Sequence, residues 1–236
     1  MEDAFKSALE GLDAPETQVT ELPFSFLAVL PVTGASVSTL GGLLGSQTVS
    51  ATDESSAWLD ELQFDLGEGP CWDAMRLSRP VMEPELRGRG GAERWPAFAR
   101  AAQAGDAASI FAFPLTVGNL RFGAIDLYSS SPLRFDHMQT TQASAMAAVI
   151  ARRVLRERIN ELEMPDETSL SPFSRRKVHQ ATGMVLAQLG IDAEDARLLL
   201  HSRAFATEST VMSVAEDVLA GRLVFTKDAG TIGVGS

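Results

Sequence analysis

The sequence predicts an α+β domain followed by a small helical bundle. Two pairs of strand-like runs, each joined by a glycine-containing turn, indicate an antiparallel sheet. The stretches between these pairs have helical features, which is typical of helices that flank a sheet. Beyond residue 164 the apolar patterns have a helical period, so we expect a separate bundle there.

The strand predictions rest on short runs of branched and aromatic residues. Residues 35–40 and 48–51 alternate small with β-branched side chains, and Gly-Gly and Gly-Ser turn signals separate them. Residues 109–117 and 121–129 are clearer runs, joined by a turn at Gly118-Asn119. We therefore expect four antiparallel strands arranged as two hairpins.

Three short helices are expected between the hairpins, over residues 54–62, 70–77 and 95–104. From residue 136 nothing interrupts a helix until Pro165. Apolar residues at alternating steps of three and four form a seam on this helix, interrupted by Arg152: Ala145, Ala148, Leu155, Ile159 and Leu162. The seam covers fewer than three good heptads and is a signal for pairing of two chains.

A polar, helix-breaking stretch at residues 164–169 predicts a linker. After it, capping residues and glycines place three helices at about residues 172–190, 193–206 and 210–220. These helices form a bundle of about 50 residues. Residues 226–236 are rich in glycine and lack an apolar face, so we expect a disordered tail.

Composition excludes several classes of function. The 236 residues carry a formal net charge of −11, which argues against a general nucleic-acid coat or a binder of anionic membranes. The single cysteine, Cys71, excludes intramolecular disulfides and multi-cysteine zinc clusters. Residues 1–19 are acidic and amphipathic, which predicts a helical segment rather than a secretory signal, and no apolar run reaches the roughly 20 residues of a membrane span. We expect a cytoplasmic protein without a metal site.

The first bundle helix has two different faces. At helical spacing its core stripe contains Val178, Ala181, Val185, Leu186 and Leu189, with Thr182 among them. The opposite face contains Arg176, Gln180, Gly183 and Ala187. An exposed glycine in the middle of a helix costs about 1 kcal/mol relative to alanine. Close approach of another molecule to this backbone would explain it, and Arg176 and Gln180 could then bond a phosphate or a base edge.

Basic residues gather near this face and on the second helix. The first cluster contains Arg175, Arg176, Lys177 and His179, and the second contains Arg197, His201 and Arg203. The interpretations that stay open for the clusters are phosphate contacts, a solvated surface and, for His201 and Arg203, a favourable charge near a helix C-terminus. Gly183 is likewise open between a nucleic-acid contact, close packing of another helix, and a tolerated glycine.

Three segments resemble a known family of sensory domains. Residues 66–71 contain Gly-Glu-Gly-Pro, residues 113–115 are Phe-Pro-Leu, and residues 122–128 are Phe-Gly-Ala-Ile-Asp-Leu-Tyr. Together they are similar to a GAF domain of the kind found ahead of ANTAR domains, over about residues 20–160. The resemblance implies a sensory domain at residues 20–135, a connecting helix at residues 136–164, and a ligand pocket between the sheet and the short helices.

The bundle resembles the ANTAR domain. The matching positions are Arg176, Ala181 to Met184, Asp192 to Ala196, Leu200, Ala204, Val214 and Ala215. The resemblance implies an ANTAR-like bundle at residues 165–225 that binds paired-hexaloop RNA stems and prevents transcription termination. With the basic clusters, it gives these candidate RNA-binding residues: Arg175, Arg176, Lys177, Gln180, Ala181, Thr182, Gly183, Arg197, His201 and Arg203.

Two positions depart from the ANTAR pattern. The family usually has lysine where this chain has Thr182, and arginine where it has His201. Each change removes a fixed positive charge, because histidine is mostly neutral at pH 7. We therefore expect reduced phosphate affinity and a reduced dependence of binding on salt.

The residues do not suggest an enzyme. Cys71 would need a histidine partner for nucleophilic catalysis, and His137, His179 and His201 are all predicted on helices outside the sensory core. The ligand pocket that the GAF resemblance implies would be lined by apolar candidates: Trp58, Phe64, Cys71, Trp72, Phe111 and Phe113. Core packing is the alternative role for each of them, and the cofactor or ligand is unknown.

These observations predict a cytoplasmic, signal-responsive regulator. A small-molecule ligand would act on the sensory domain, the helix at residues 136–164 would pair two chains into a homodimer, and the bundle would bind an RNA stem-loop. The alternative hypothesis keeps this fold and makes the bundle a dimerisation or protein-interaction module without RNA affinity. The substitutions at Thr182 and His201 and the net charge favour the alternative.

Overall fold

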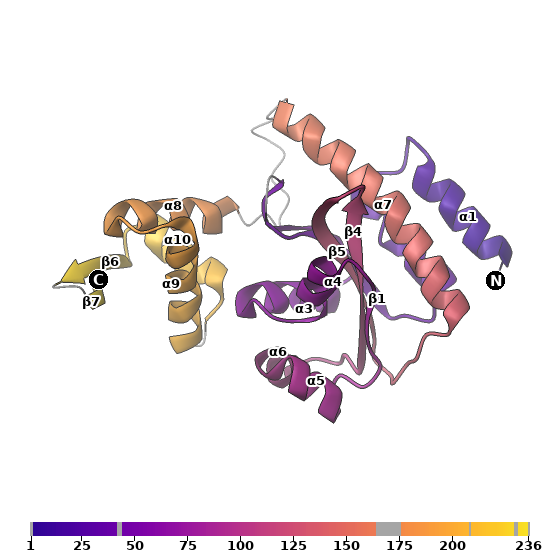
Figure 1. The fold of residues 1–236 in the computed structure, drawn as a ribbon, viewed down its shortest axis with the longest axis horizontal. Helices are drawn as coiled ribbons and strands as arrows, with labels where there is room; N and C mark the ends of the chain where they lie inside the picture. Colours follow the sequence, from indigo (N-terminus) through magenta and orange to yellow (C-terminus); the bar gives the residue numbers. More distant parts are fainter. Residues whose placement is uncertain (1, 42–43, 164–175, 208, 229–230, 236) are drawn as a thin grey trace. The chain divides into compact units, whose positions relative to one another are not determined.

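The chain divides into two compact units, with the division after Phe173. The computed structural model describes most of the chain: residues 2–41, 44–163, 176–207, 209–228 and 231–235. In chain order, the elements of the first unit (Figure 1) are α1 (Glu2–Asp13), η1 (Val19–Glu21), α2 (Phe24–Val29), β1 (Gly34–Thr39), β2 (Gln47–Ala51), α3 (Glu54–Leu66), α4 (Pro70–Leu77), β3 (Val81–Glu83), α5 (Arg89–Arg94), α6 (Pro96–Ala101), η3 (Ala102–Ala104), β4 (Ser109–Val117), β5 (Leu120–Ser129) and α7 (His137–Glu163).

A five-stranded antiparallel sheet forms the centre of the first unit. Its strand order is β2-β1-β5-β4-β3. Both predicted hairpins are present, as β1–β2 and β4–β5, and β5 pairs with β1 as well as with β4. The short strand β3 was not predicted. The α+β class, with an antiparallel sheet and flanking helices, is confirmed.

Side-chain alternation along β4 separates two cores. Phe111, Phe113 and Leu115 are fully buried in a cluster with residues of α1, α2 and α7. Ile110 and Ala112 point the other way, into a cluster with residues of α3, α4 and α6. In Figure 1, α1 and α7 lie on one side of the strands and α3 and α4 on the other. The sheet is therefore the middle layer of three.

Helix α7 packs along the sheet over much of its length. Ala143, Met146, Ile150 and Val154 follow one another at helical spacing and are fully buried in the core, each with 0% solvent accessibility. The helix packs against β4 and against α1. The segments 1–19 and 136–164, which the sequence suggested as separate from the sensory domain, are therefore parts of the same unit.

Arg153 joins α7 to the N-terminal segment. Its guanidinium donates to three backbone carbonyl oxygens, those of Leu12 (2.8 Å), Ala14 (2.7 Å) and Thr17 (2.5 Å). Because the carbonyl groups at the end of α1 lack partners within their own helix, a cation at this position satisfies them and also interacts favourably with the helix dipole. The arginine thus holds α1 against α7.

The apolar seam predicted on α7 lies mostly outside the core that packs on the sheet, although Leu155 packs against that core. Ala148 and Ile159 are exposed, and Ala145 and Leu155 are half-buried. The side chain of Leu162 lies outside the described residues. Much of the seam is thus uncovered within the described part of this unit, and pairing of two chains stays a prediction.

The described part of the second unit consists of a three-helix bundle and a β-hairpin. Its elements are α8 (Arg176–Leu189), α9 (Ala193–Ala206), α10 (Val211–Leu219), β6 (Val224–Asp228) and β7 (Thr231–Gly235). The predicted caps are present, because the Asp192 side chain accepts from the Asp195 amide and Thr210 accepts from the Ser213 amide. The predicted linker at 164–169 and the predicted start of helix one at Pro172 lie outside the described residues.

The three helices share one apolar core. Each packs against the other two. The buried side chains are Val178, Ala181, Val185, Leu189, Ala196, Leu200, Ala204, Val211, Val214, Ala215 and Val218. None of the helices in the described part of the chain combines the length and the apolar character needed to cross a membrane.

The prediction of a disordered tail from residue 226 is wrong for the described residues. β6 and β7 pair as an antiparallel hairpin, with Phe225 opposite Val234. The Phe225 side chain is buried, and β6 packs against α8. Besides its glycines the segment contains branched and aromatic residues, among them Phe225, Ile232 and Val234, and these favour a strand once a side chain such as Phe225 is buried.

Candidate functional site

The six residues predicted to line one ligand pocket lie on two faces of the sheet. Phe111 and Phe113 belong to the core beneath α1, α2 and α7, and the Phe111 ring stacks on Phe135 with 4.2 Å between ring centroids. Trp58 and Phe64 come from α3, on the opposite face. Phe111 and Phe113 are alternate residues of one strand and point to the face opposite α3. They therefore do not share a pocket with Trp58, and their placement in the predicted pocket is corrected.

The remaining two candidates lie at the beginning of α4. Cys71 is fully buried and packs with Leu40 and Ala124, and Trp72 packs against the same cluster. The Trp72 indole Nε1 donates to the backbone oxygen of Gln63, at 2.8 Å. Burial of this kind agrees with the interpretation of Cys71 as a structural residue.

A buried polar cluster occupies the same face of the sheet and was missed by the sequence analysis. Asp60 of α3 accepts a hydrogen bond from Thr48 of β2, and Asp126 of β5 accepts one from the Gln63 side chain, at 2.6 Å. Asp60 is 1% exposed and Asp126 is 5% exposed. Burial raises the pKa of the Asp126 carboxyl well above its ordinary value of 3.8, and the charge of Asp60 raises it further, against the hydrogen bond from Gln63. The neutral form of Asp126 is favoured.

Gln63 connects this cluster to α4. Its side-chain oxygen accepts from the Cys71 amide, at 2.9 Å. Gly69 passes directly over Gln63, since a Cβ on Gly69 would lie 2.5 Å from the Gln63 side chain, and its φ is +139°. Only glycine fits this position without strain.

The Gly-Glu-Gly-Pro motif ties α4 to α6. The Glu68 carboxylate accepts from the Phe98 amide in the first turn of α6, at 2.7 Å. Asp73 of α4 accepts from the Trp95 indole, at 3.1 Å, and is paired with Arg76 and Arg94. The motif therefore acts as a structural joint between two of the helices that cover the sheet.

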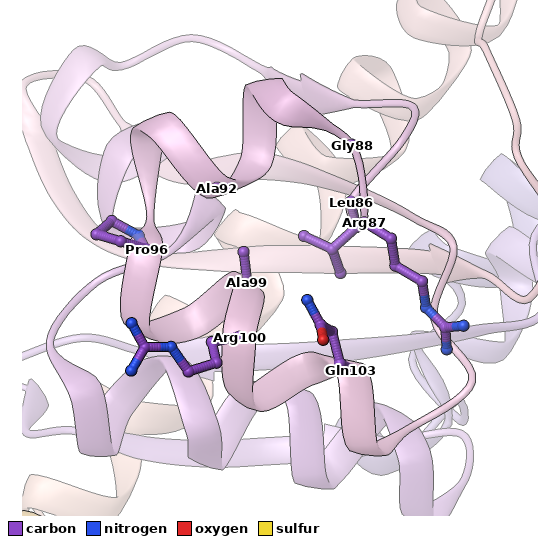
Figure 2. A pocket seen from close by; sticks show the side chains of 8 residues that line it. All are labelled: Leu86, Arg87, Gly88, Ala92, Pro96, Ala99, Arg100 and Gln103. Carbon is purple, nitrogen blue, oxygen red and sulfur yellow. The ribbon is translucent and has the colours of Figure 1, made fainter.

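A hollow of about 260 Å³ lies between α5 and α6. Its apolar lining comes from Leu86, Ala92, Pro96 and Ala99, and its polar lining includes Arg87, Arg100 and Gln103. Figure 2 shows Leu86, Ala99 and Gln103 in the middle of the hollow, with Arg87 and Arg100 toward its two ends. None of these residues was a candidate in the sequence analysis.

In the second unit, α8 has a bare surface opposite its core stripe. Gln180, Gly183 and Ala187 are exposed, and we call them the Gly183 face. Apart from the chain neighbours and the backbone of α8 itself, no atom of the described residues lies within 4 Å of the position that a Cβ would occupy on Gly183. Packing of another element of this unit therefore does not explain the glycine.

Other candidate RNA-binding residues on α8 differ in accessibility. Ala181 is fully buried in the bundle core, and the half-buried Thr182 donates its hydroxyl to the Val178 carbonyl, at 2.7 Å, so neither side chain belongs to the Gly183 face. Lys177 is exposed and pairs with Glu216 of α10, at 2.7 Å. Arg175 and the side chain of Arg176 lie outside the described residues.

The structure does not bring the three basic candidates on α9 together. Arg197 and His201 are four residues apart and share one flank of the helix. Arg203 comes two residues after His201 and lies on the other flank. All three are half-buried. The exposed stripe of α9 is instead apolar at two positions, with Leu198 51% exposed and Phe205 73% exposed.

Comparison with known proteins identifies the first unit. The family model described as the GAF domain matches residues 9–154, which is more than half of the chain. No curated protein matches the chain significantly.

Solved structures share the fold at low identity. The GAF domain of an Acinetobacter phosphoenolpyruvate-protein phosphotransferase is similar with a TM-score of 0.52 and 10% identity, over 68% of this chain and 96% of that one. The chromophore-binding domain of a bacteriophytochrome from R. palustris is similar with a TM-score of 0.50 and 10% identity, over 69% of this chain and 62% of that one. The antiparallel sheet, its flanking helices and the family match agree, and the chain belongs to the GAF domain family.

Proposed function

We propose that this chain is a signal-responsive RNA-binding regulator. GAF domains are a signal-sensing family, and the first unit supplies that part of the proposal. The second unit would bind an RNA stem-loop of the paired-hexaloop type and favour transcription antitermination, as its resemblance to the ANTAR domain implies. The chain would act as a regulator and not as an enzyme.

The bare surface around Gly183 is the observation that carries the RNA proposal. A glycine within a helix lowers the stability of the fold by about 1 kcal/mol relative to alanine, and no neighbour among the described residues of its unit requires the small size. A glycine allows close approach of another backbone, and the exposed Gln180 side chain beside it offers donors and an acceptor to a phosphate or a base. The Gly183 face therefore suits a nucleic-acid ligand.

The charges around this face are few, which favours a bivalent mode of binding. Lys177 already shares its charge with Glu216, and Thr182 and His201 replace cations expected in the family. Two such surfaces in a homodimer would bind a paired stem-loop more tightly than one, because the second contact becomes intramolecular. The exposed positions Ala148 and Ile159 of the α7 seam support such pairing.

Electrophoretic mobility shifts with a paired-hexaloop RNA test the proposal. The double variant Arg176→Ala, Gly183→Glu should lose binding, because it removes a cation and places a carboxylate on the Gly183 face. Gly11→Glu is the matched control, since Gly11 is an exposed glycine of α1 with no atom near its Cβ position. Equal binding by the wild-type protein and the double variant would remove this surface from the proposal.

A salt titration of the same complex tests the nature of the contact. Phosphate contacts release counterions, so the logarithm of the binding constant should fall linearly with the logarithm of the salt concentration. A binding constant that does not change with salt would contradict phosphate recognition by this bundle.

The exposed residues of α9 favour a second candidate function. Leu198 and Phe205 are seven residues apart on one stripe of α9, a spacing typical of contact with another protein. In this case the bundle would be a protein-interaction or dimerisation module without RNA affinity. Sedimentation of Phe205→Ser beside the wild-type protein tests it, since a protein interface on this stripe predicts dissociation of the variant while RNA binding would be absent from both.

A further inference from the structure

We propose that the hollow between α5 and α6 binds a small organic anion. Its volume of about 260 Å³ lies just below the roughly 300–1,000 Å³ of pockets for drug-sized ligands, so it suits a small metabolite. Figure 2 shows guanidinium groups toward both ends of the hollow and apolar side chains between them. This arrangement fits a ligand with a carboxylate or phosphate group attached to an apolar body.

The two arginines that line the hollow are available to an anion. The Arg87 guanidinium donates to the Gly105 carbonyl, at 2.6 Å, which fixes its position, and within the described residues it forms no ion pair. Arg100 is exposed, and among the described residues its side chain forms neither an ion pair nor a hydrogen bond. Arginine is the side chain best suited to bidentate contact with carboxylate and phosphate groups.

Neighbouring acidic side chains are engaged elsewhere. Glu85 pairs with Arg134, at 3.1 Å, and Glu93 of α5 pairs with Arg89, at 2.8 Å. Glu85 and Glu93 are therefore each paired with another arginine, and the buried carboxylate of Glu83 accepts a hydrogen bond from the Glu85 amide. Among the described residues neither Glu85 nor Glu93 pairs with Arg87 or Arg100, so a ligand would supply the counter-charge of these two arginines.

The middle of the hollow selects for an apolar body. Leu86 is 1% exposed and Ala99 is 3% exposed, so these two side chains close the floor of the hollow, and the exposed Ala92 and Pro96 supply its accessible apolar surface. Ala92 and Pro96 complete this lining, and the Gln103 amide adds a donor and an acceptor beside it. An inorganic ion would leave this apolar lining unused, whereas an organic anion covers it.

The hollow is connected to the sheet through α4. The amide of Phe98 in α6 donates to Glu68, and the indole of Trp95 donates to Asp73 of α4. A ligand that changes the spacing of α5 and α6 would therefore act on α4, which packs against β4 and β5. This regulatory consequence rests on the proposed function, but binding of the anion does not.

Titration of the ¹⁵N-labelled full chain with benzoate and with phenyl phosphate tests the inference by NMR spectroscopy. Saturable shifts are expected for the amide signals of Gly88, Ala92, Ala99 and the Gln103 side chain. Benzamide, a neutral molecule of the same shape as benzoate, should bind much more weakly. The stronger of the two anions identifies the preferred head group, and because RNA is absent the result is independent of the RNA proposal.

Variants of the chain locate the anion contact. Arg100→Gln should weaken binding of benzoate roughly threefold to tenfold, the range expected for a partly solvated charged hydrogen bond. Arg100 is exposed and its side chain forms no ion pair or hydrogen bond with the described residues, so the fold should be unaffected. Arg79→Gln removes an exposed arginine that does not line the hollow and should leave the affinity unchanged. Equal affinity for benzoate and benzamide, unchanged affinity in Arg100→Gln, or absence of saturable shifts at these signals would overturn the inference.

Discussion

Replacing Gly183 by alanine should stabilise the bundle and weaken RNA binding at the same time. Outside its own helix backbone and chain neighbours, the new methyl group meets no atom of the described part of the chain within 4 Å, so there is no steric penalty to subtract. The expected gain is the full difference in helix propensity, about 0.8–1.0 kcal/mol. Because the bundle is a separate compact unit, this gain should be confined to α8 and the helices that pack against it.

Hydrogen exchange measured by mass spectrometry can resolve this local effect. A gain of about 0.8–1.0 kcal/mol should slow exchange from peptides of α8 and α10 about fourfold to fivefold, provided that exchange follows opening of the bundle. Peptides of the first unit should exchange at unchanged rates. RNA affinity, measured in parallel, should fall because the methyl group occupies the surface that the RNA backbone approaches.

A matched substitution separates stability from binding. Gly11→Ala places a methyl group on an equally open position of α1. It should slow exchange in the first unit and leave RNA affinity unchanged. The reasoning would be refuted if Gly183→Ala accelerated exchange in the bundle, which would mean that a neighbour covers this face. It would also be refuted if the variant bound RNA as tightly as the wild-type protein.

Three further substitutions test the first unit. Asp126→Asn should gain stability relative to the wild-type protein as the pH rises above 3.8. The pKa of the Asp126 carboxyl is raised in the folded state, so this carboxyl loses its proton first in the unfolded chain, which then becomes more favourable. Urea unfolding between pH 3 and pH 7 checks this prediction, and a stability difference that does not depend on pH would contradict it. Arg153→Ala should destabilise the unit by roughly 2–3 kcal/mol, with faster hydrogen exchange in α1, whereas unchanged exchange there would contradict its role. Gly69→Ala should destabilise it by about 3 kcal/mol or more in thermal unfolding, since a Cβ would lie 2.5 Å from Gln63, and a neutral effect would contradict the strain.

Local sequence signals were sufficient where they agreed with the final packing. The hairpin of β4 and β5 follows from two runs of branched and aromatic residues around Gly118, whose φ is +58°. Helix α4 has the predicted bounds because Pro70 stands at its first position. The backbone amide at that position has no hydrogen-bond partner within any helix, so proline loses nothing there. Helix α3 continues to Leu66, beyond the predicted residue 62, and ends where Gly67 adopts a left-handed conformation.

Features that depend on distant contacts were not predictable in this way. The alternation in β4 separates Phe111 and Phe113 from Ile110 and Ala112, but which set faces which helices depends on the packing of α7 and α4. The hollow between α5 and α6 depends on how two short helices pack. The sequence did contain one signal for the buried polar cluster that the prediction left unused. Asp126 is a carboxylate within an apolar strand run, and such a residue indicates a buried polar contact.

In the bundle, too, helical periodicity predicted the core correctly, whereas a strand pair that depends on a contact with another element was not predicted. Helical periodicity placed Val178, Val185 and Leu189 in the core and Gly183 on the surface, and the structure agrees. Composition failed for the hairpin of β6 and β7, because the contact of β6 with α8 outweighs the flexibility of its glycines.

Ultraviolet crosslinking of the full chain to RNA that copurifies with it tests the central claim most directly. Mass spectrometry would identify the crosslinked peptides, and sequencing would identify the RNA. The account predicts crosslinks to residues 176–187 of α8 and RNA with stem-loop structure. Crosslinks confined to the first unit, or preparations in which no RNA is crosslinked, would contradict it.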